Sequence, residues 1–349
     1  MALTVRRRGF AFAVGTAVLC VAVWVGSAVV PTATAFAQAP LVPLTFQLNF
    51  TAGGYNAGFA LALQQGYYKR EGLDVKIEKG QGSAITAQLV AGGKADIGYA
   101  DALAVMQLIA KGAPMKVVAT IYQSNPNAVT VLANSPIKTI QDLKGHSVGT
   151  PSGQSQTAMI PILFKATGLS DSDVKLVSMP GSAMVATLLQ QQVDAILGSL
   201  DAYDIILHQR GVETRDFAFG DYGVATVSTS VIASNAFLAQ HKDIVSKFLK
   251  ASLDGWNDAI KRPEDAVKAL QQTFPADAEP ARNLLELKAA IALVCKNNAK
   301  FVGKAEPEAW AQTTSVAQQV LDLPTTLPAT AYYTYEALPA TLPTSCPLR

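Results

Sequence analysis

The chain has 349 residues, of which 50% are hydrophobic and 15% are charged, and its formal net charge is +2. Residues 1–37 contain three arginines and no acidic residue, so their removal lowers the net charge by three, to −1. This charge balance gives no indication of a nucleic-acid partner, and the length is sufficient for two lobes with a substantial core.

Residues 1–37 have the features of a secretory signal peptide. Three arginines precede an apolar run from about Phe10 to Val30, and Ala35-Phe36-Ala37 forms an A-x-A cleavage site. We therefore expect export to the periplasm and cleavage near Ala37. A retained membrane anchor is the alternative, because about 20 apolar residues can span a bilayer. Arg7-Arg8 partly fits a twin-arginine signal, so the export route stays open.

Residues 44–79 predict a strand, a loop, a helix and a second strand. Apolar and polar residues alternate from Leu44 to Phe50, which is a strand pattern, and Gly53-Gly54 then favours a turn. A helix is expected from Asn56, its N-cap, to Tyr68. In an open α/β sheet, ligands bind where a strand ends and a helix begins.

Similar units follow, and they occur in both halves of the chain. Residues 87–101 and 186–201 each predict a helix, a short connection, a strand and an Asp-Ala pair that opens the next helix. This repetition predicts two α/β lobes that face each other across a cleft, although αβ units can also share such patterns by chance. We expect lobe 1 to comprise residues 38–131 and 226–349, and lobe 2 to comprise residues 132–225.

The last third of the chain predicts helices and a proline-containing tail. Cys295 and Cys346 are the only cysteines left after cleavage. In an oxidising compartment such a pair predicts one disulfide, here Cys295–Cys346, that anchors the tail. Two unpaired thiols are the alternative.

The segment GFALALQQGYYKREGLDVKIEKGQG, Gly58 to Gly82, resembles the start of periplasmic substrate-binding proteins of ABC importers. The resemblance extends over roughly residues 44–275. It is strongest to the thiamine-pyrimidine-precursor-binding family, beside the nitrate, taurine and alkanesulfonate binders. The family's Leu-Asp-Trp and His-Ala-Gly motifs correspond here to Leu48-Asn49-Phe50 and Asn56-Ala57-Gly58. The resemblance implies an α/β, two-lobed periplasmic binding protein fold of type II, each lobe a sheet flanked by helices, and an ABC permease as partner.

The ends of the predicted strands supply aromatic and polar candidates for ligand contacts. No lysine or arginine falls in these loops, which favours a neutral or singly charged ligand. The aromatic residues could instead pack in the core, and the aspartates and serines could instead cap helices. The expected ligand-binding residues are Phe50, Tyr55, Asn56, Ser83, Asp101, Tyr122, Ser152, Gln154, Ser155, Ser199, Asp201 and Asp204.

Catalytic motifs are absent from the sequence. The three histidines lie far apart, and no H-E-x-x-H, C-x-x-C, G-x-S-x-G or P-loop pattern occurs. We therefore predict a monomeric solute-binding protein that is not an enzyme, needs no cofactor or metal, and captures a pyrimidine-like or other small aromatic ligand. The alternatives are a nitrate, sulfonate or taurine binder, a pyrimidine-synthesis enzyme of the same fold, and a periplasmic sensor.

Overall fold

The structure is a computed structural model, and it describes residues 40–152, 155–296, 301–321, 323–343 and 346. The predicted signal peptide and Gln154 lie outside these residues, as does the side chain of Ser155. Among the described residues, no helix has the length and apolar character needed to cross a membrane.

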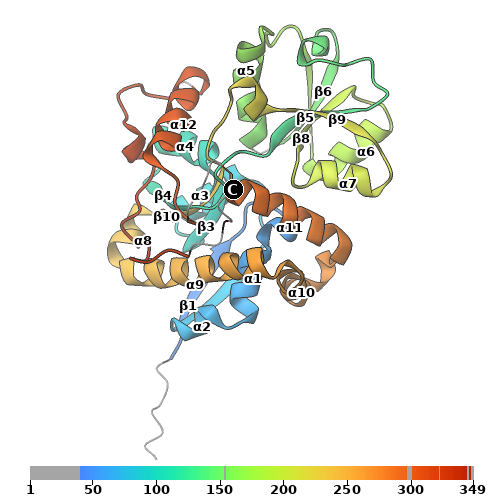
Figure 1. Cartoon of the computed structure of the whole chain (residues 1–349). Coiled ribbons are helices and arrows are strands. Elements are labelled where there is room, and N and C mark those ends of the chain that lie inside the picture. The colour runs from blue at the N-terminus through green and yellow to red at the C-terminus, as the bar shows by residue number, and fades with distance from the viewer. Residues whose placement is uncertain (1–39, 153–154, 297–300, 322, 344–345, 347–349) are drawn as a thin grey trace, which may run out of the picture. The chain divides into compact units, whose positions relative to one another are not determined.

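Two five-stranded sheets form the framework (Figure 1). The first has the strand order β2-β1-β3-β10-β4, and β10 runs antiparallel to both of its neighbours. Its strands are β1 (Val42–Gln47), β2 (Leu73–Glu78), β3 (Ile97–Asp101), β4 (Met115–Thr120) and β10 (Thr229–Ser234).

The second sheet has the order β7-β6-β8-β5-β9, and β5 runs antiparallel to β8 and β9. Its strands are β5 (Asn127–Leu132), β6 (Ser147–Pro151), β7 (Lys175–Met179), β8 (Ala195–Ser199) and β9 (Thr214–Ala218). The lobe boundary predicted after residue 131 would divide β5. Because β5 pairs only with β8 and β9 in the described chain, the second sheet begins at Asn127.

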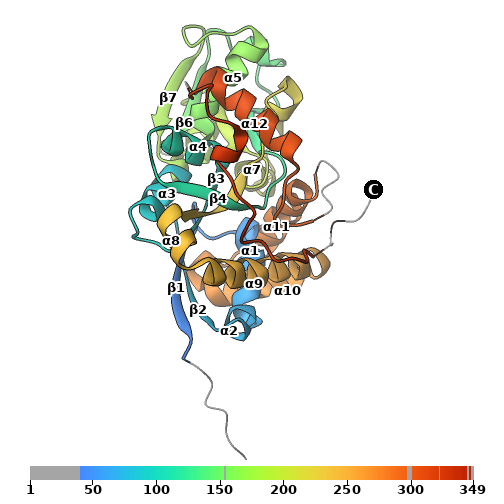
Figure 2. The same ribbon diagram turned by 90° about the vertical axis from the view of Figure 1, so that its left-hand side faces the viewer.

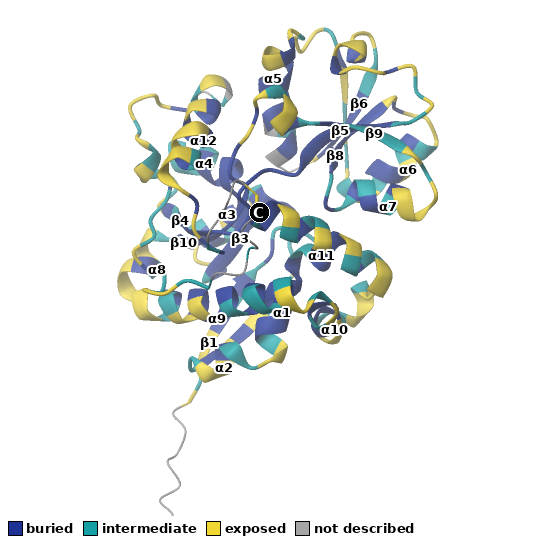
Figure 3. Ribbon diagram, viewed as in Figure 1, coloured by how far each residue is buried: buried dark blue, intermediate teal, exposed yellow. Residues whose placement is uncertain are grey.

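Helices cover the sheets, whose central strands β3, β8, β5 and β10 are buried, while the edge strand β7 and the outer helical faces are largely exposed or half-buried (Figure 3). The helices that flank the first sheet are α1 (Ala57–Gln64), α2 (Tyr67–Arg70), α3 (Ser83–Ala91), α4 (Ala102–Ala110), α8 (Asn235–Gln240), α9 (Lys242–Lys261), α10 (Pro263–Thr273) and α11 (Pro280–Val294). Those of the second sheet are α5 (Ser155–Thr167), α6 (Met184–Leu189) and α7 (Tyr203–Gln209), and α12 (Pro307–Val320) follows later in the chain.

Two connections carry the chain between the sheets. The first, residues 121–126, joins β4 to β5, and the second, residues 219–228, joins β9 to β10. Asn125 on the first connection donates from Nδ2 to the Val224 carbonyl oxygen at 2.8 Å and to Thr226 Oγ1 at 3.1 Å on the second. The Ser228 N–H donates to the Tyr122 carbonyl oxygen at 3.1 Å. These bonds fix the two connections side by side.

The C-terminal segment returns along both sets of helices. Helix α12 packs against α4 and α5 (Figure 2), and Thr313 Oγ1 on α12 accepts from the Val227 N–H of the second connection at 2.9 Å. The predicted disulfide between Cys295 and Cys346 is confirmed. It attaches the tail to the end of α11.

Candidate ligand-binding site

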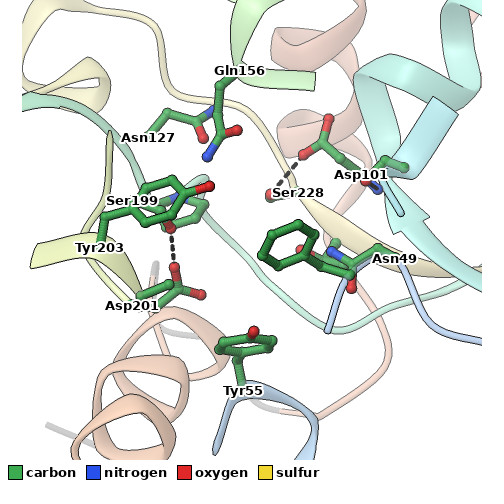
Figure 4. A pocket seen from close by; sticks show the side chains of 15 residues that line it. Asn49, Tyr55, Asp101, Asn127, Gln156, Ser199, Asp201, Tyr203 and Ser228 are labelled. Carbon is green, nitrogen blue, oxygen red and sulfur yellow. Dashed lines mark hydrogen bonds between the residues drawn. The ribbon is translucent and has the colours of Figure 1, made fainter. Parts of the chain in front are cut away.

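A cavity of about 600 Å³, part of it open to solvent, lies where elements of both sheets meet (Figure 4). The residues that line it are Asn49, Phe50, Tyr55, Gly82, Ser83, Asp101, Pro126, Asn127, Gln156, Ser199, Asp201, Ala202, Tyr203, Ser228 and Thr229.

The topology explains why these residues meet. Parallel strands such as β3 and β8 deliver residues at their carboxyl ends, here Asp101 and Ser199. The antiparallel strands β10 and β5 deliver residues at their amino ends, because Thr229 pairs with Asp101 and Asn127 pairs with Ser199. Both kinds of strand therefore contribute to the same edge of a sheet.

Asp101 is the central polar residue on the side of the first sheet. It ends β3 and caps α4, since Oδ1 accepts from the Leu103 N–H at 3.0 Å. Oδ2 accepts from Ser228 Oγ at 2.7 Å, and the Asp101 N–H donates to Ser83 Oγ at 3.0 Å. The helix-cap alternative is thus correct for Asp101, and the same carboxylate also borders the cavity.

Asp201 is the corresponding carboxylate on the side of the second sheet, and it is 6% exposed. Ser199 Oγ donates to Oδ1, and the Tyr122 hydroxyl donates to Oδ2 at 3.0 Å, so this bond joins the first connection to the end of β8. Burial raises the pKa of the Asp201 carboxyl, and the two hydrogen bonds oppose that rise. Burial and the Asp201 charge raise the pKa of Tyr122, which keeps this phenol a donor.

Three aromatic side chains, Phe50, Tyr55 and Tyr203, also line the cavity. Tyr55 lies at its floor and Tyr203 beside Asp201 (Figure 4). The Tyr55 hydroxyl donates to the Thr51 carbonyl oxygen at 3.1 Å, and burial raises its pKa, so the phenol is uncharged.

The loop that carries Tyr55 is fixed by α11. Glu286 Oε2 accepts from the Gly54 N–H at 2.7 Å, and Glu286 Oε1 lies 3.1 Å from Arg282 Nε. Burial raises the pKa of the Glu286 carboxyl, while these contacts lower it. Gly54 is required for this close approach, because a Cβ there would lie 1.9 Å from the Asn283 carbonyl oxygen.

Two amide side chains on the cavity wall retain hydrogen-bonding capacity. Gln156 Oε1 and Asn49 Oδ1 are buried and have no hydrogen-bond partner among the residues that the structure describes. Because buried polar groups are nearly always hydrogen-bonded in native proteins, these two oxygens are positioned to accept from a bound molecule.

The structure brings six of the predicted residues together around the cavity: Phe50, Tyr55, Ser83, Asp101, Ser199 and Asp201. Tyr122 lies behind Asp201, Asn56 is buried beneath the loop, Ser152 bonds to Ser178 Oγ at 2.9 Å, and Asp204 accepts from Thr214 at 2.8 Å. These four do not line the cavity. Asn56 occupies the predicted N-cap position of α1, but its side chain makes no capping hydrogen bond.

Three of the lining residues that the sequence analysis does not predict lie at the amino ends of strands. The prediction covers the carboxyl ends of strands, whereas Asn127, Ser228 and Thr229 lie at or next to the amino ends of the antiparallel strands β5 and β10. The clusters of polar residues at 123–127 and 226–230, each next to an apolar strand-like run, were the available signal. Gln156 and Tyr203 lie close in sequence to predicted residues, on the first turns of α5 and α7.

The fold is that of the two-lobed periplasmic binding proteins. A family model described as NMT1/THI5 like matches residues 54–266, and the chain belongs to this family. The structure also superposes on the periplasmic aliphatic sulphonate binding protein SsuA from Escherichia coli, with a TM-score of 0.67 and 18% sequence identity. The match covers 84% of this chain and 97% of SsuA. This structural similarity concerns the fold.

Relatives include both binding proteins and enzymes. The riboflavin-binding protein RibY of Chloroflexus aurantiacus is 28% identical over 244 residues, which is 68% of each chain. The formylaminopyrimidine-binding protein of Halalkalibacterium halodurans is 25% identical over 292 residues, 81% of this chain and 87% of the relative. The 4-amino-5-hydroxymethyl-2-methylpyrimidine phosphate synthase of Schizosaccharomyces pombe is 24% identical over 236 residues, 64% of this chain and 68% of the relative.

Proposed function

We propose that this protein is an exported solute-binding protein that captures a small pyrimidine-like or other aromatic ligand between its two sheets and delivers it to an ABC permease. The observation that carries the proposal is the cavity itself, which combines aromatic faces with polar groups from both sheets. Small-molecule sites have this composition, an apolar lining with a few converging polar groups. Two relatives are named for binding riboflavin and a formylaminopyrimidine, both nitrogen heterocycles.

The charges of the cavity argue against the nitrate, sulfonate and taurine alternatives. The described residues that line it include Asp101 and Asp201 and no lysine or arginine. An anion would therefore lie between two carboxylates that both repel it, which is unfavourable. We therefore do not transfer the anionic ligands of proteins with this fold to the present protein.

Binding is also favoured over catalysis. The described cavity lining contains no histidine or cysteine, and the described residues hold no group of three or more His, Cys, Asp or Glu suited to a metal ion. The serine, threonine and tyrosine hydroxyls of the lining thus have no imidazole beside them to act as a general base, and its two carboxylates already accept hydrogen bonds. We propose a binding role, with the pyrimidine-synthesis activity of some relatives as the alternative.

Ligand binding would act through the two connections between the sheets. A ligand that contacts Asp101 and Asp201 at once bridges both sheets, and it favours the closed arrangement by its differential affinity for that arrangement. The residues of the connections are held by Asn125 and by the Tyr122–Asp201 hydrogen bond. A ligand that bridges the two carboxylates would thus hold the two sheets together, and the permease would bind this closed form.

The test of this function is native mass spectrometry of the protein purified from the periplasm of its own organism. We expect an added mass that is released on denaturation and corresponds to a nitrogen heterocycle. Protein that carries no such molecule, and that is not stabilised against heat by riboflavin or by 4-amino-5-hydroxymethyl-2-methylpyrimidine, would contradict the proposal.

Export itself has a direct prediction. Signal cleavage at the A-x-A site should give a mature chain that begins at Gln38. N-terminal sequencing of the periplasmic protein checks this, and a mature chain that still starts at Met1 or Ala2 would refute it.

Removal of the aromatic floor should weaken binding. Tyr55→Ala is expected to lower the affinity for the ligand found by mass spectrometry about tenfold or more, because a stacked ring contributes on the order of 1 kcal/mol beyond the apolar area that it buries. The control is His146→Ala, whose imidazole lies 3.4 Å from Asp194 and does not line the cavity. Calorimetry should find wild-type affinity for the control, and the reverse ranking would mean that the ligand binds elsewhere.

A further inference from the structure

The Asp201 carboxylate is a charge buried in the cavity wall without a cationic partner in the described chain. Its donors are the hydroxyls of Ser199 and Tyr122, and both are neutral. No described lysine, arginine or histidine lies within 4.0 Å of it. Hydrogen bonds from neutral donors satisfy the lone pairs of the carboxylate but do not compensate its negative charge. Burial of a carboxylate without a positive partner carries a desolvation penalty.

The remainder of the cavity has the same sign of charge. Asp101 faces the cavity from the opposite side (Figure 4), and the described lining adds no basic side chain. Electrostatic interactions strengthen in a low-dielectric space, so the two carboxylates together create a negative potential at the centre of the cavity.

Aromatic rings surround that centre. Tyr55 lies below Asp201 and Tyr203 beside it, and Phe50 also belongs to the lining. The faces of aromatic rings attract cations, and the attraction strengthens where the contact is desolvated. Rings grouped around a carboxylate form a suitable environment for an ammonium group or a positively charged ring.

An independent feature indicates N–H donors on the bound molecule. Gln156 is only 7% exposed, it lines the cavity from the first turn of α5, and its Oε1 has no hydrogen-bond partner among the described residues. Figure 4 shows its side chain directed into the cavity, above Ser199 and Tyr203. A ligand with an N–H group directed at Oε1 would satisfy this acceptor.

We propose that the ligand is a small organic cation, either a protonated amine or amidine or a positively charged nitrogen heterocycle, whose charge lies against Asp201 between the aromatic rings. This inference rests on the proposed function and specifies the class of solute. Asp201 then acts as the specificity-determining residue, because it distinguishes a cation from a neutral molecule of the same shape. The uncharged part of the ligand contacts Phe50, and an N–H group bonds to Gln156.

Calorimetry with matched pairs tests the charge. The probes are thiamine and the uncharged 4-amino-5-hydroxymethyl-2-methylpyrimidine, benzylamine and benzyl alcohol, and choline and 3,3-dimethylbutan-1-ol, with riboflavin and nitrate added singly. The protein is the mature chain, freed of bound ligand by unfolding and refolding. We expect at least one cation to bind about tenfold or more tightly than its neutral counterpart.

The Asp201→Asn variant should lower cation affinity about tenfold or more and should change the affinity of neutral probes less than threefold. The matched control is Asp194→Asn, at the opposite end of β8 and outside the cavity lining, which removes the same charge. Circular dichroism and thermal unfolding establish that both variants fold. If Asp201→Asn does not fold, the wild-type comparison of the pairs still decides.

Each outcome decides a different claim. Neutral heterocycles that bind as tightly as the cations would overturn the cationic ligand and leave the proposed function standing. Preferential binding of nitrate would overturn both. Failure of every probe to bind would overturn the proposed function, and the inference with it.

Discussion

Replacement of both Cys295 and Cys346 by alanine is expected to lower the free energy of unfolding by about 4 kcal/mol. The disulfide closes a loop of 51 residues, and the chain-entropy model relates the stabilisation to that length. Urea unfolding, followed by fluorescence and by far-ultraviolet circular dichroism, should show a clearly lower midpoint for the double variant.

The segment that this disulfide closes also contributes buried contacts. The Trp310 indole Nε1 donates to the Tyr335 hydroxyl at 2.8 Å, and that hydroxyl lies 2.8 Å from Thr120 Oγ1 at the end of β4. The Thr334 N–H donates to the Val117 carbonyl oxygen at 2.9 Å. Once the loop is no longer covalently closed, these contacts must offset the full ordering entropy of the segment.

The control for the disulfide is reduction. Dithiothreitol should shift the wild-type protein to the midpoint of the double variant and should leave the double variant unchanged. Equal midpoints for oxidised wild type and the variant would show that the cross-link does not stabilise the fold.

The parallel strand–loop–helix units were predictable because their signals are local. The alternation that begins at Leu44 reappears as β1, which ends at Gln47, and the apolar run after Asn56 begins α1. The helix expected to continue to Tyr68 instead ends at Gln64 and resumes as α2, because Gly66 between them adopts a left-handed φ of 68°. The disulfide was predictable because the expected compartment is oxidising and the number of cysteines left after signal cleavage is even. This prediction required no knowledge of where the tail packs. Helix periodicity shows which face of α12 is buried, but it does not show that α4 and α5 are its neighbours.

The candidate site was predictable only in part, for two physical reasons. The rule about carboxyl ends finds Asp101 and Asp201, but the residues delivered by β5 and β10 depend on antiparallel pairing between segments far apart in sequence. The contact of Glu286 with the Gly54 N–H joins residues 232 positions apart, and no local pattern reports it. Long-range register therefore decides which polar residues converge.

Gly54→Ala is expected to destabilise the protein by about 3 kcal/mol or more. The added Cβ would lie 1.9 Å from the Asn283 carbonyl oxygen and 2.6 Å from the Leu287 nitrogen. Both atoms belong to the backbone of α11, so a rotamer change cannot relieve the clash, and the helix or the loop must move. That movement breaks the 2.7 Å bond from the Gly54 N–H and removes a partner of the buried Glu286 carboxyl.

The same movement should also reach the cavity, because Tyr55 follows Gly54 directly and forms its floor. Gly220→Ala is the matched control. A Cβ at Gly220 meets nothing within 4 Å, and its backbone does not adopt a positive φ. Gly220→Ala should therefore leave stability within about 1 kcal/mol of wild type or raise it slightly, through the lower entropy of the unfolded chain.

Thermal and urea unfolding of the two variants in parallel measure the difference. If Gly54→Ala and Gly220→Ala unfold at the same midpoint, α11 does not pack as closely on this loop as the structure shows, and the support for Tyr55 must come from elsewhere.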